Sequence, residues 1–127
     1  MPDPMFFILY VDQPQRSAGF YAKLLGRAPV ESSPTFALFV LPSGLKLGLW
    51  SKHTVEPAAT NAAQALGGGA ELVFALDSRE AVEAAHAAWR QEGLRILQAP
   101  TAMDFGYTFV ALDPDEHRLR VYVQENE

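Results

Sequence analysis

The sequence predicts an α+β protein made of two repeated βαβββ modules. The same order of elements, a strand, a helix and three strands, occurs twice along the 127 residues. Val11-Asp12 recurs as Leu76-Asp77, 65 positions later (77 − 12), and Pro42 recurs as Pro114, 72 positions later (114 − 42). A chain of this size buries roughly two-thirds of its unfolded surface. We therefore expect one domain, residues 1–127, with modules at about 5–50 and 71–123 joined by a connector at 51–70.

The first module begins with Met5 to Val11, a short apolar stretch that predicts a buried strand. Asp12 is expected to cap the following helix, with Pro14 in its first turn and Gly26 at its end. The turn Pro42-Ser43-Gly44 should join the last two strands as a hairpin. The three strands after the helix are predicted at 28–32, 36–41 and 45–50.

The connector from Ser51 to Ala70 ends in Gly67-Gly68-Gly69. This glycine run lacks the lysine of a phosphate-binding loop and precedes a strand, so we interpret it as a flexible linker. In the second module Asp77 and Glu80 have the spacing of a capping box, and Gly93 should end the helix. The strands are predicted at 71–76, 94–99, 107–112 and 117–123.

Charge and composition exclude several function classes. The net charge of −5 and the pI near 5.1 argue against a nucleic-acid-binding surface. The apolar stretches are far shorter than the ~20 residues of a membrane span, and the first residues lack the pattern of a signal peptide. The absence of cysteine excludes disulfides and thiolate chemistry. We expect a cytoplasmic protein whose partner is a small molecule.

Several segments together resemble the vicinal oxygen chelate superfamily of glyoxalase, bleomycin-resistance and dioxygenase proteins. They are Leu9-Tyr10-Val11-Asp12, Phe20-Tyr21, Leu24-Leu25-Gly26, Asp113-Pro114-Asp115 and His117-Arg118-Leu119. This resemblance implies a curved mixed sheet around a cleft, and commonly a homodimer with the cleft at or near the interface. A narrower resemblance is to the phenazine-antibiotic resistance proteins of that superfamily, carried among others by Leu49-Trp50-Ser51 and Phe105-Gly106. Glu116 replaces the glycine that usually follows Asp-Pro-Asp, which predicts a mildly strained turn.

Metal-using members of the superfamily place four ligands in the cleft, and the repeat register puts Phe6, Gly48, Glu71 and Arg120 at those positions. Arginine cannot ligate a metal, and a lone carboxylate facing a guanidinium prefers an ion pair. We therefore predict no metal and no other cofactor. The histidines lack the spacing of a metal motif and are predicted to be surface or packing residues: His53, His86 and His117.

Strand alternation and the resemblance together give the expected ligand-binding residues, and no catalytic residue. Gly48 should leave room for a flat ring against Trp50, and Arg120 could pair with a ligand carboxylate. The resemblance also suggests that Met103 to Phe105 form a loop that closes over the ligand. The full predicted set is Phe6, Ile8, Gly48, Trp50, Glu71, Phe105, Arg120 and Tyr122.

The leading functional hypothesis is a metal-independent protein, not an enzyme, that sequesters a planar, carboxylate-bearing aromatic compound such as a phenazine antibiotic. A second hypothesis is a divalent-metal lyase, isomerase or dioxygenase of the same superfamily. A third is a subunit or regulatory module without a small ligand. The connector at 51–70 is long enough for two chains to exchange halves.

Overall fold

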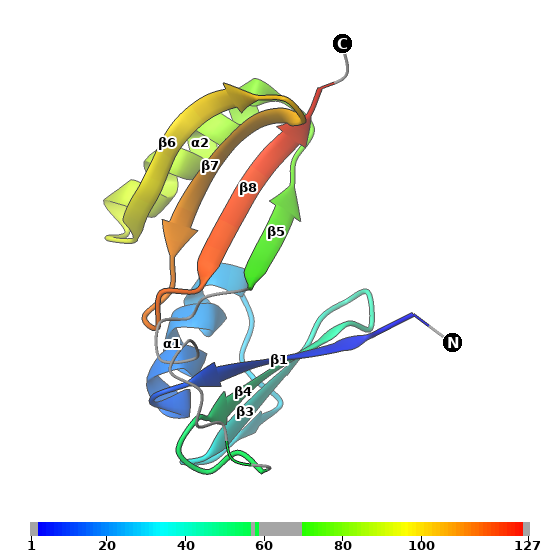
Figure 1. Ribbon diagram of the computed structural model, residues 1–127, viewed down its shortest axis with the longest axis vertical. Helices are drawn as coiled ribbons and strands as arrows, with labels where there is room; N and C mark the ends of the chain where they lie inside the picture. Colours follow the sequence, from blue (N-terminus) through cyan, green and yellow to red (C-terminus); the bar gives the residue numbers. More distant parts are fainter. Residues whose placement is uncertain (1–2, 57, 59–69, 126–127) are drawn as a thin grey trace. The chain divides into compact units, whose positions relative to one another are not determined.

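The computed structural model describes residues 3–56, 58 and 70–125, and it divides the chain into two compact units, Met1–Ala65 and Leu66–Glu127. Each unit is one four-stranded sheet with one helix (Figure 1). Most of the predicted connector, including its three glycines, lies outside the described residues. The α+β class and the two βαβββ modules are confirmed. No helix in the described part of the chain is long and apolar enough to cross a membrane.

The first unit has the strand order β1-β4-β3-β2. β1 pairs in parallel with β4, and the other pairs are antiparallel. Its elements are β1 (Phe6–Val11), α1 (Pro14–Leu25), β2 (Glu31–Ser32), β3 (Phe36–Val40) and β4 (Lys46–Ser51).

The second unit repeats this topology with the order β5-β8-β7-β6, and β5 is parallel to β8. Its elements are β5 (Glu71–Ala75), α2 (Arg79–Gln91), β6 (Arg95–Met103), β7 (Gly106–Leu112) and β8 (Arg118–Gln124).

The pairing register confirms the repeat predicted from the sequence. Phe6 lies opposite Lys46 in the first unit, and Glu71 lies opposite Arg118 in the second. These partners are related by the predicted shifts of 65 (71 − 6) and 72 (118 − 46). A register error of one residue would have moved every side chain to the other face of the sheet. The sequence repeat therefore identifies which side chains share a face in both units.

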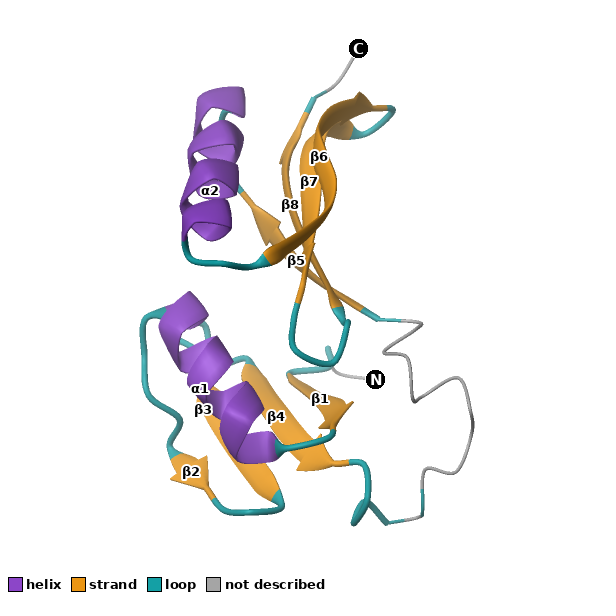
Figure 2. Cartoon of the chain, turned by 90° about the vertical axis from the view of Figure 1, so that its left-hand side faces the viewer, coloured by secondary structure: helices purple, strands orange, loops and turns teal. Residues whose placement is uncertain are grey.

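Each helix covers one face of its own sheet, and the core of each unit lies between the two (Figure 2). In the first unit Leu9, Tyr21 and Phe39 are buried there. In the second unit the Phe109 ring lies 5.4 Å from Trp89 and 5.2 Å from His86, measured between ring centroids. Trp89 therefore packs between α2 and the sheet.

Both helix starts differ from the prediction. The residue before α1 is Gln13, which makes no side-chain cap, and Asp12 instead contacts His53 (Oδ1–Nε2, 2.6 Å). In α2 the cap is Ser78, whose hydroxyl accepts a hydrogen bond from the Ala81 backbone N–H at 3.0 Å. An aspartate and a serine are adjacent here, and both are good caps, so composition alone selected the wrong one. Pro14 does begin α1, as predicted.

The turn between β7 and β8 has the predicted strain. Glu116 has a φ of 68°, the left-handed conformation that residues with a Cβ disfavour. Asp113 holds the turn: its Oδ1 accepts from the backbone N–H groups of Asp115 and His117 at 2.8 Å. In the first unit the matching position is occupied by Gly44, whose φ is 93°.

Candidate functional site

In the second unit, the face of the sheet opposite α2 carries the polar and aromatic side chains of β5 and β8. Arg120 and Tyr122 on β8 are half-buried there, while Leu119 and Val121 between them are buried toward the helix. The same face carries Val73 of β5, opposite Arg120 in the ladder. Alternation along β8 thus presents an arginine and a tyrosine side by side to the open face.

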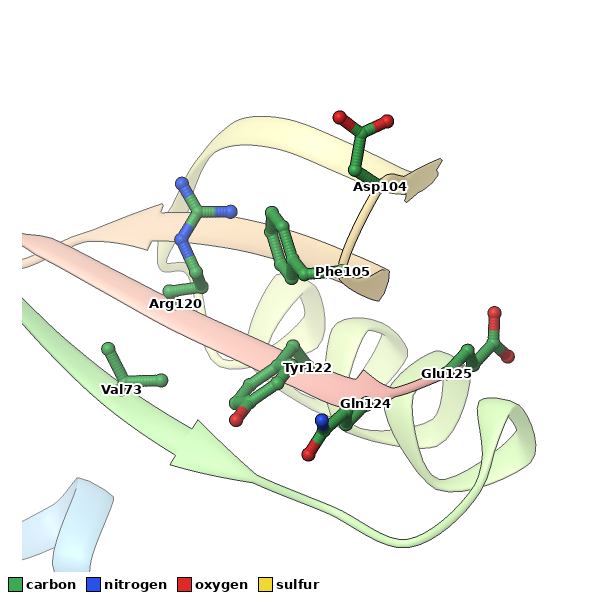
Figure 3. Close-up of a pocket in the computed structure, with 7 residues that line it drawn as sticks. All are labelled: Val73, Asp104, Phe105, Arg120, Tyr122, Gln124 and Glu125. Atoms are coloured by element: carbon green, nitrogen blue, oxygen red, sulfur yellow. The ribbon is translucent and has the colours of Figure 1, made fainter. Parts of the chain in front are cut away.

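A pocket of about 460 Å³ lies on this face, a volume within the range of small-molecule sites (Figure 3). Val73, Arg120 and Tyr122 line it from the strands, and Phe105 lines it from the turn between β6 and β7. Three more polar residues complete the lining: Asp104, Gln124 and Glu125.

Aromatic rings form one wall of this pocket. The rings of Phe105 and Tyr122 lie 5.9 Å apart between centroids, with an angle of 68° between their planes. The guanidinium carbon of Arg120 lies 5.7 Å from the centroid of the Phe105 ring. Phe105 keeps 40% of its surface exposed, so part of its ring is available for contact with a ligand.

The segment that carries Phe105 is a two-residue hairpin turn, which corrects the predicted loop. β6 extends to Met103, which pairs with Gly106, so only Asp104 and Phe105 connect the strands. Gly106 has a φ of 151°, and a Cβ there would lie 2.0 Å from the Val123 carbonyl oxygen. The Phe105 carbonyl also accepts a hydrogen bond from the Glu125 N–H at 3.1 Å. The turn is therefore held against β8 and is not a free lid.

Glu71 and Arg120 form the ion pair predicted from the sequence. Arg120 donates from Nε to Oε1 at 3.0 Å and from Nη2 to Oε2 at 3.2 Å. Its Nη1 donates to the hydroxyl of Thr108, 3.2 Å away. Hydrogen bonding from Arg120 lowers the pKa of Glu71 below its ordinary value. The guanidinium is thus already occupied on three of its sides by groups of the protein.

The predicted residues of the first unit lie on the face of their own sheet opposite α1, where Phe6 and Ile8 are exposed at 45% and 40%. The expected room above Gly48 is filled by the protein itself. A Cβ on Gly48 would lie 2.9 Å from the Phe36 ring and 3.0 Å from the Phe6 ring. Phe36 also packs edge-on against Trp50, at 6.1 Å between ring centroids. Gly48 therefore accommodates two phenylalanines of this chain, which corrects the expected slot for a flat ring.

The four superfamily ligand positions form two pairs, one in each unit. Phe6 lies against the backbone of Gly48, and Glu71 is bonded to Arg120. The convergence of all four on one hollow stays a prediction. The side chains at these four positions do not form a ligand set for a divalent metal, because phenylalanine and glycine offer no ligating group and arginine is a cation. Over the described residues, no three His, Asp or Glu side chains are grouped as metal ligands would be.

Two histidines take part in pairs with aspartate. His53 is exposed beside Asp12, and His117 is buried, with its Nδ1 at 2.8 Å from Asp113 Oδ2 inside the strained turn. Both pairs join residues close to strand ends. His53 thus lies at the surface and His117 is buried in the turn, positions compatible with the surface or packing roles expected for them.

The predicted ligand-binding set lacks four residues that line the pocket, Val73, Asp104, Gln124 and Glu125, and it lacks Thr108, which contacts Arg120. Gln124 continues the alternation of Arg120 and Tyr122 along β8, so the pattern could have identified it. Thr108 lies opposite Tyr122 in the ladder and could have been found in the same way. Glu125 follows the end of β8, where alternation gives no information.

The model of the Glyoxalase/Bleomycin resistance protein/Dioxygenase superfamily matches residues 5–121. A phenazine antibiotic resistance protein, EhpR of Enterobacter agglomerans, is 26% identical over 121 residues, covering 93% of this chain and 89% of that protein.

Solved structures show the same fold. Protein ATC0852 of Agrobacterium tumefaciens, solved by NMR, is 55% identical with a TM-score of 0.88, covering 99% of this chain and 100% of that one. A glyoxalase/bleomycin resistance protein/dioxygenase from Nocardioides has a TM-score of 0.82 at 21% identity, covering 98% and 84%. The family match spans nearly the whole chain, and it agrees with the repeated βαβββ topology. The chain belongs to the glyoxalase/bleomycin resistance protein/dioxygenase superfamily.

Proposed function

We propose that this protein binds and sequesters a planar aromatic compound of the phenazine class, without a metal ion and without transforming it. The observation that carries the proposal is the pocket of about 460 Å³ with Phe105 and Tyr122 in its wall. Two aromatic rings beside several polar groups offer a contact surface to a flat heteroaromatic ring. The similarity to EhpR, whose name describes phenazine antibiotic resistance, supports this ligand class.

Metal independence is supported by the side chains at the four ligand positions. Glu71 is the one residue among them with a metal-ligating group, and Arg120 takes both of its carboxylate oxygens. Binding of a divalent cation there would require breaking this pair and placing the cation beside a guanidinium. Sequestration through stacking and shape needs no such ion.

The test is isothermal titration of the protein with phenazine, with and without EDTA. We expect saturable binding that EDTA does not change. Truncation of the exposed ring in Phe105→Ala should weaken binding by roughly tenfold, because it removes an aromatic contact and its buried area. The matched control is Leu97→Ala, an exposed apolar residue outside the pocket, which should bind as the wild type does. Absence of any heat or thermal shift with phenazine, or binding that requires added divalent metal, would contradict the proposal.

The proposal includes a homodimer, for which β1 provides the support. β1 lies at the edge of its sheet, and Phe6, Phe7 and Ile8 are 40–49% exposed. An exposed apolar edge strand favours association with a second copy of the chain. Light scattering should give the mass of a dimer, and Phe7→Lys should give that of a monomer. Val30→Lys, at another exposed apolar position of this unit, should remain dimeric. A monomeric wild-type protein would exclude this part of the proposal.

A further inference from the structure

The charges around the pocket are already paired within the protein, with one exception. The cation Arg120 donates two hydrogen bonds to Glu71, whose side chain is 32% exposed. The acid Glu125 is held in the same way by Arg79, at 2.6 and 2.8 Å. Each of these charges therefore has its counter-ion from this chain.

The exception is Asp104 at the rim of the pocket. It is exposed, and among the described residues none donates a hydrogen bond to its carboxylate or forms an ion pair with it. Figure 3 shows it beyond the Phe105 ring, with its carboxylate directed away from Tyr122. The pocket and its bonded partners thus carry one surplus negative charge.

Among the described residues that line the pocket, Arg120 is the one cation, and Glu71 neutralises its charge. Three of the five guanidinium N–H groups of Arg120 already donate to Glu71 and Thr108, so a ligand carboxylate would compete with Glu71 for the same cation and lie beside a second carboxylate. Arg118 is the next cation on this face, but it lies two residues before Arg120, opposite Glu71, and does not line the pocket. The expected pairing of Arg120 with a ligand carboxylate is thus opposed by the local contacts.

We infer that the pocket selects uncharged or cationic planar aromatic ligands and discriminates against aromatic carboxylates, with Glu71 as the residue that sets this preference. The inference rests on the proposed function and specifies its ligand class. Glu71 acts by holding the guanidinium, and Asp104 adds a field that favours a positive ring.

The test compares three ligands of nearly the same shape: phenazine, phenazine-1-carboxylate and 5-methylphenazinium. In calorimetric titrations of the wild-type protein at neutral pH, the carboxylate should bind about tenfold or more weakly than phenazine. The cation should bind at least as tightly as phenazine. The preference for the cation should fall as salt is added, because the charges at the rim are exposed to solvent.

Glu71→Gln should reverse the discrimination. It releases Arg120, so the affinity for phenazine-1-carboxylate should rise by about tenfold relative to that for phenazine. Glu31→Gln makes the same charge change on β2 of the other unit and should alter neither affinity. Asp104→Asn, at an exposed turn position of the lining, should weaken binding of 5-methylphenazinium more than that of phenazine.

The outcomes separate the two proposals. If phenazine binds but the carboxylate binds as tightly, or if Glu71→Gln leaves the carboxylate affinity unchanged relative to that for phenazine, the inference is overturned and the proposed function stands. If none of the three compounds binds, the proposed function fails and the inference fails with it.

Discussion

Replacing Glu116 with glycine is expected to stabilise the protein. Glu116 has a φ of 68° in the turn between β7 and β8, and a residue with a Cβ loses about 1–2 kcal/mol in this conformation. Glycine removes that strain but gains unfolded-state entropy of about 0.5–1 kcal/mol. The exposed contact with Arg95, at 3.6 Å, contributes little. The net gain in the free energy of unfolding should be about 0.5–1 kcal/mol.

The repeat offers a matched comparison for this substitution. Gly44 closes the equivalent turn, and its N–H donates to Leu41 as that of Glu116 donates to Asp113. Gly44→Ala should therefore destabilise the protein by about 1 kcal/mol. The nearest atom to the new Cβ is 3.9 Å away in Met5, so the loss would be conformational and not steric.

The measurement is urea unfolding followed by far-UV circular dichroism, in which the midpoint should rise for Glu116→Gly at an unchanged slope. Glu116→Ala serves as the control, because it removes the ion pair but keeps the left-handed strain. If glycine and alanine at this position were equally stable, the strain argument would be wrong.

Three further predictions concern stability. Gly19→Ala should stabilise by about 0.5–1 kcal/mol in urea unfolding, because Gly19 is exposed inside α1 and a Cβ there meets no atom within 4 Å. Gly106→Ala should destabilise by about 3 kcal/mol or more in the same assay, because its Cβ would lie 2.0 Å from the Val123 carbonyl oxygen; a neutral result would contradict this account of the turn. The pKa of Glu71 is lowered in the folded state, chiefly by hydrogen bonding from Arg120, so the unfolded state binds more protons as pH falls. Its stabilising contribution should be complete above the ordinary pKa of 4.5 and should disappear as pH falls through the lower folded value. Wild type and Glu71→Gln should therefore differ in acid-dependent stability within this window, and parallel pH profiles would refute the assignment.

The fold was predictable because the repeat carries register information. Matching Asp12 with Asp77 and Pro42 with Pro114 identified the equivalent positions of the two modules, and the strand pairing of the structure has the same shifts. The ion pair of Glu71 with Arg120 followed from that register. The helix caps were harder to predict from the sequence, because neighbouring residues such as Asp77 and Ser78 are both suited to the same capping position.

The site was predictable only in part, because side-chain packing decided what was open. Gly48 indicated a vacancy from its size alone, but the rings of Phe6 and Phe36 occupy that space. The turn at Asp104 and Phe105 lacks the usual Asn-Gly or Asp-Gly signal of a two-residue hairpin, so a longer loop was expected. Its geometry depends on the close approach of Gly106 to β8, a long-range contact that local sequence does not reveal.

The parallel pairing of the first and last strands has a consequence for how such a chain can grow. Since β1 runs alongside β4 in the same direction, the polypeptide leaves the unit travelling as it entered, and β5 with β8 behaves likewise. A further copy could be appended head to tail without turning the backbone around. Tandem duplication of a gene segment is therefore compatible with the chain direction in this topology. A unit whose last strand ran antiparallel to its first would need an added segment that reverses the chain before the next copy.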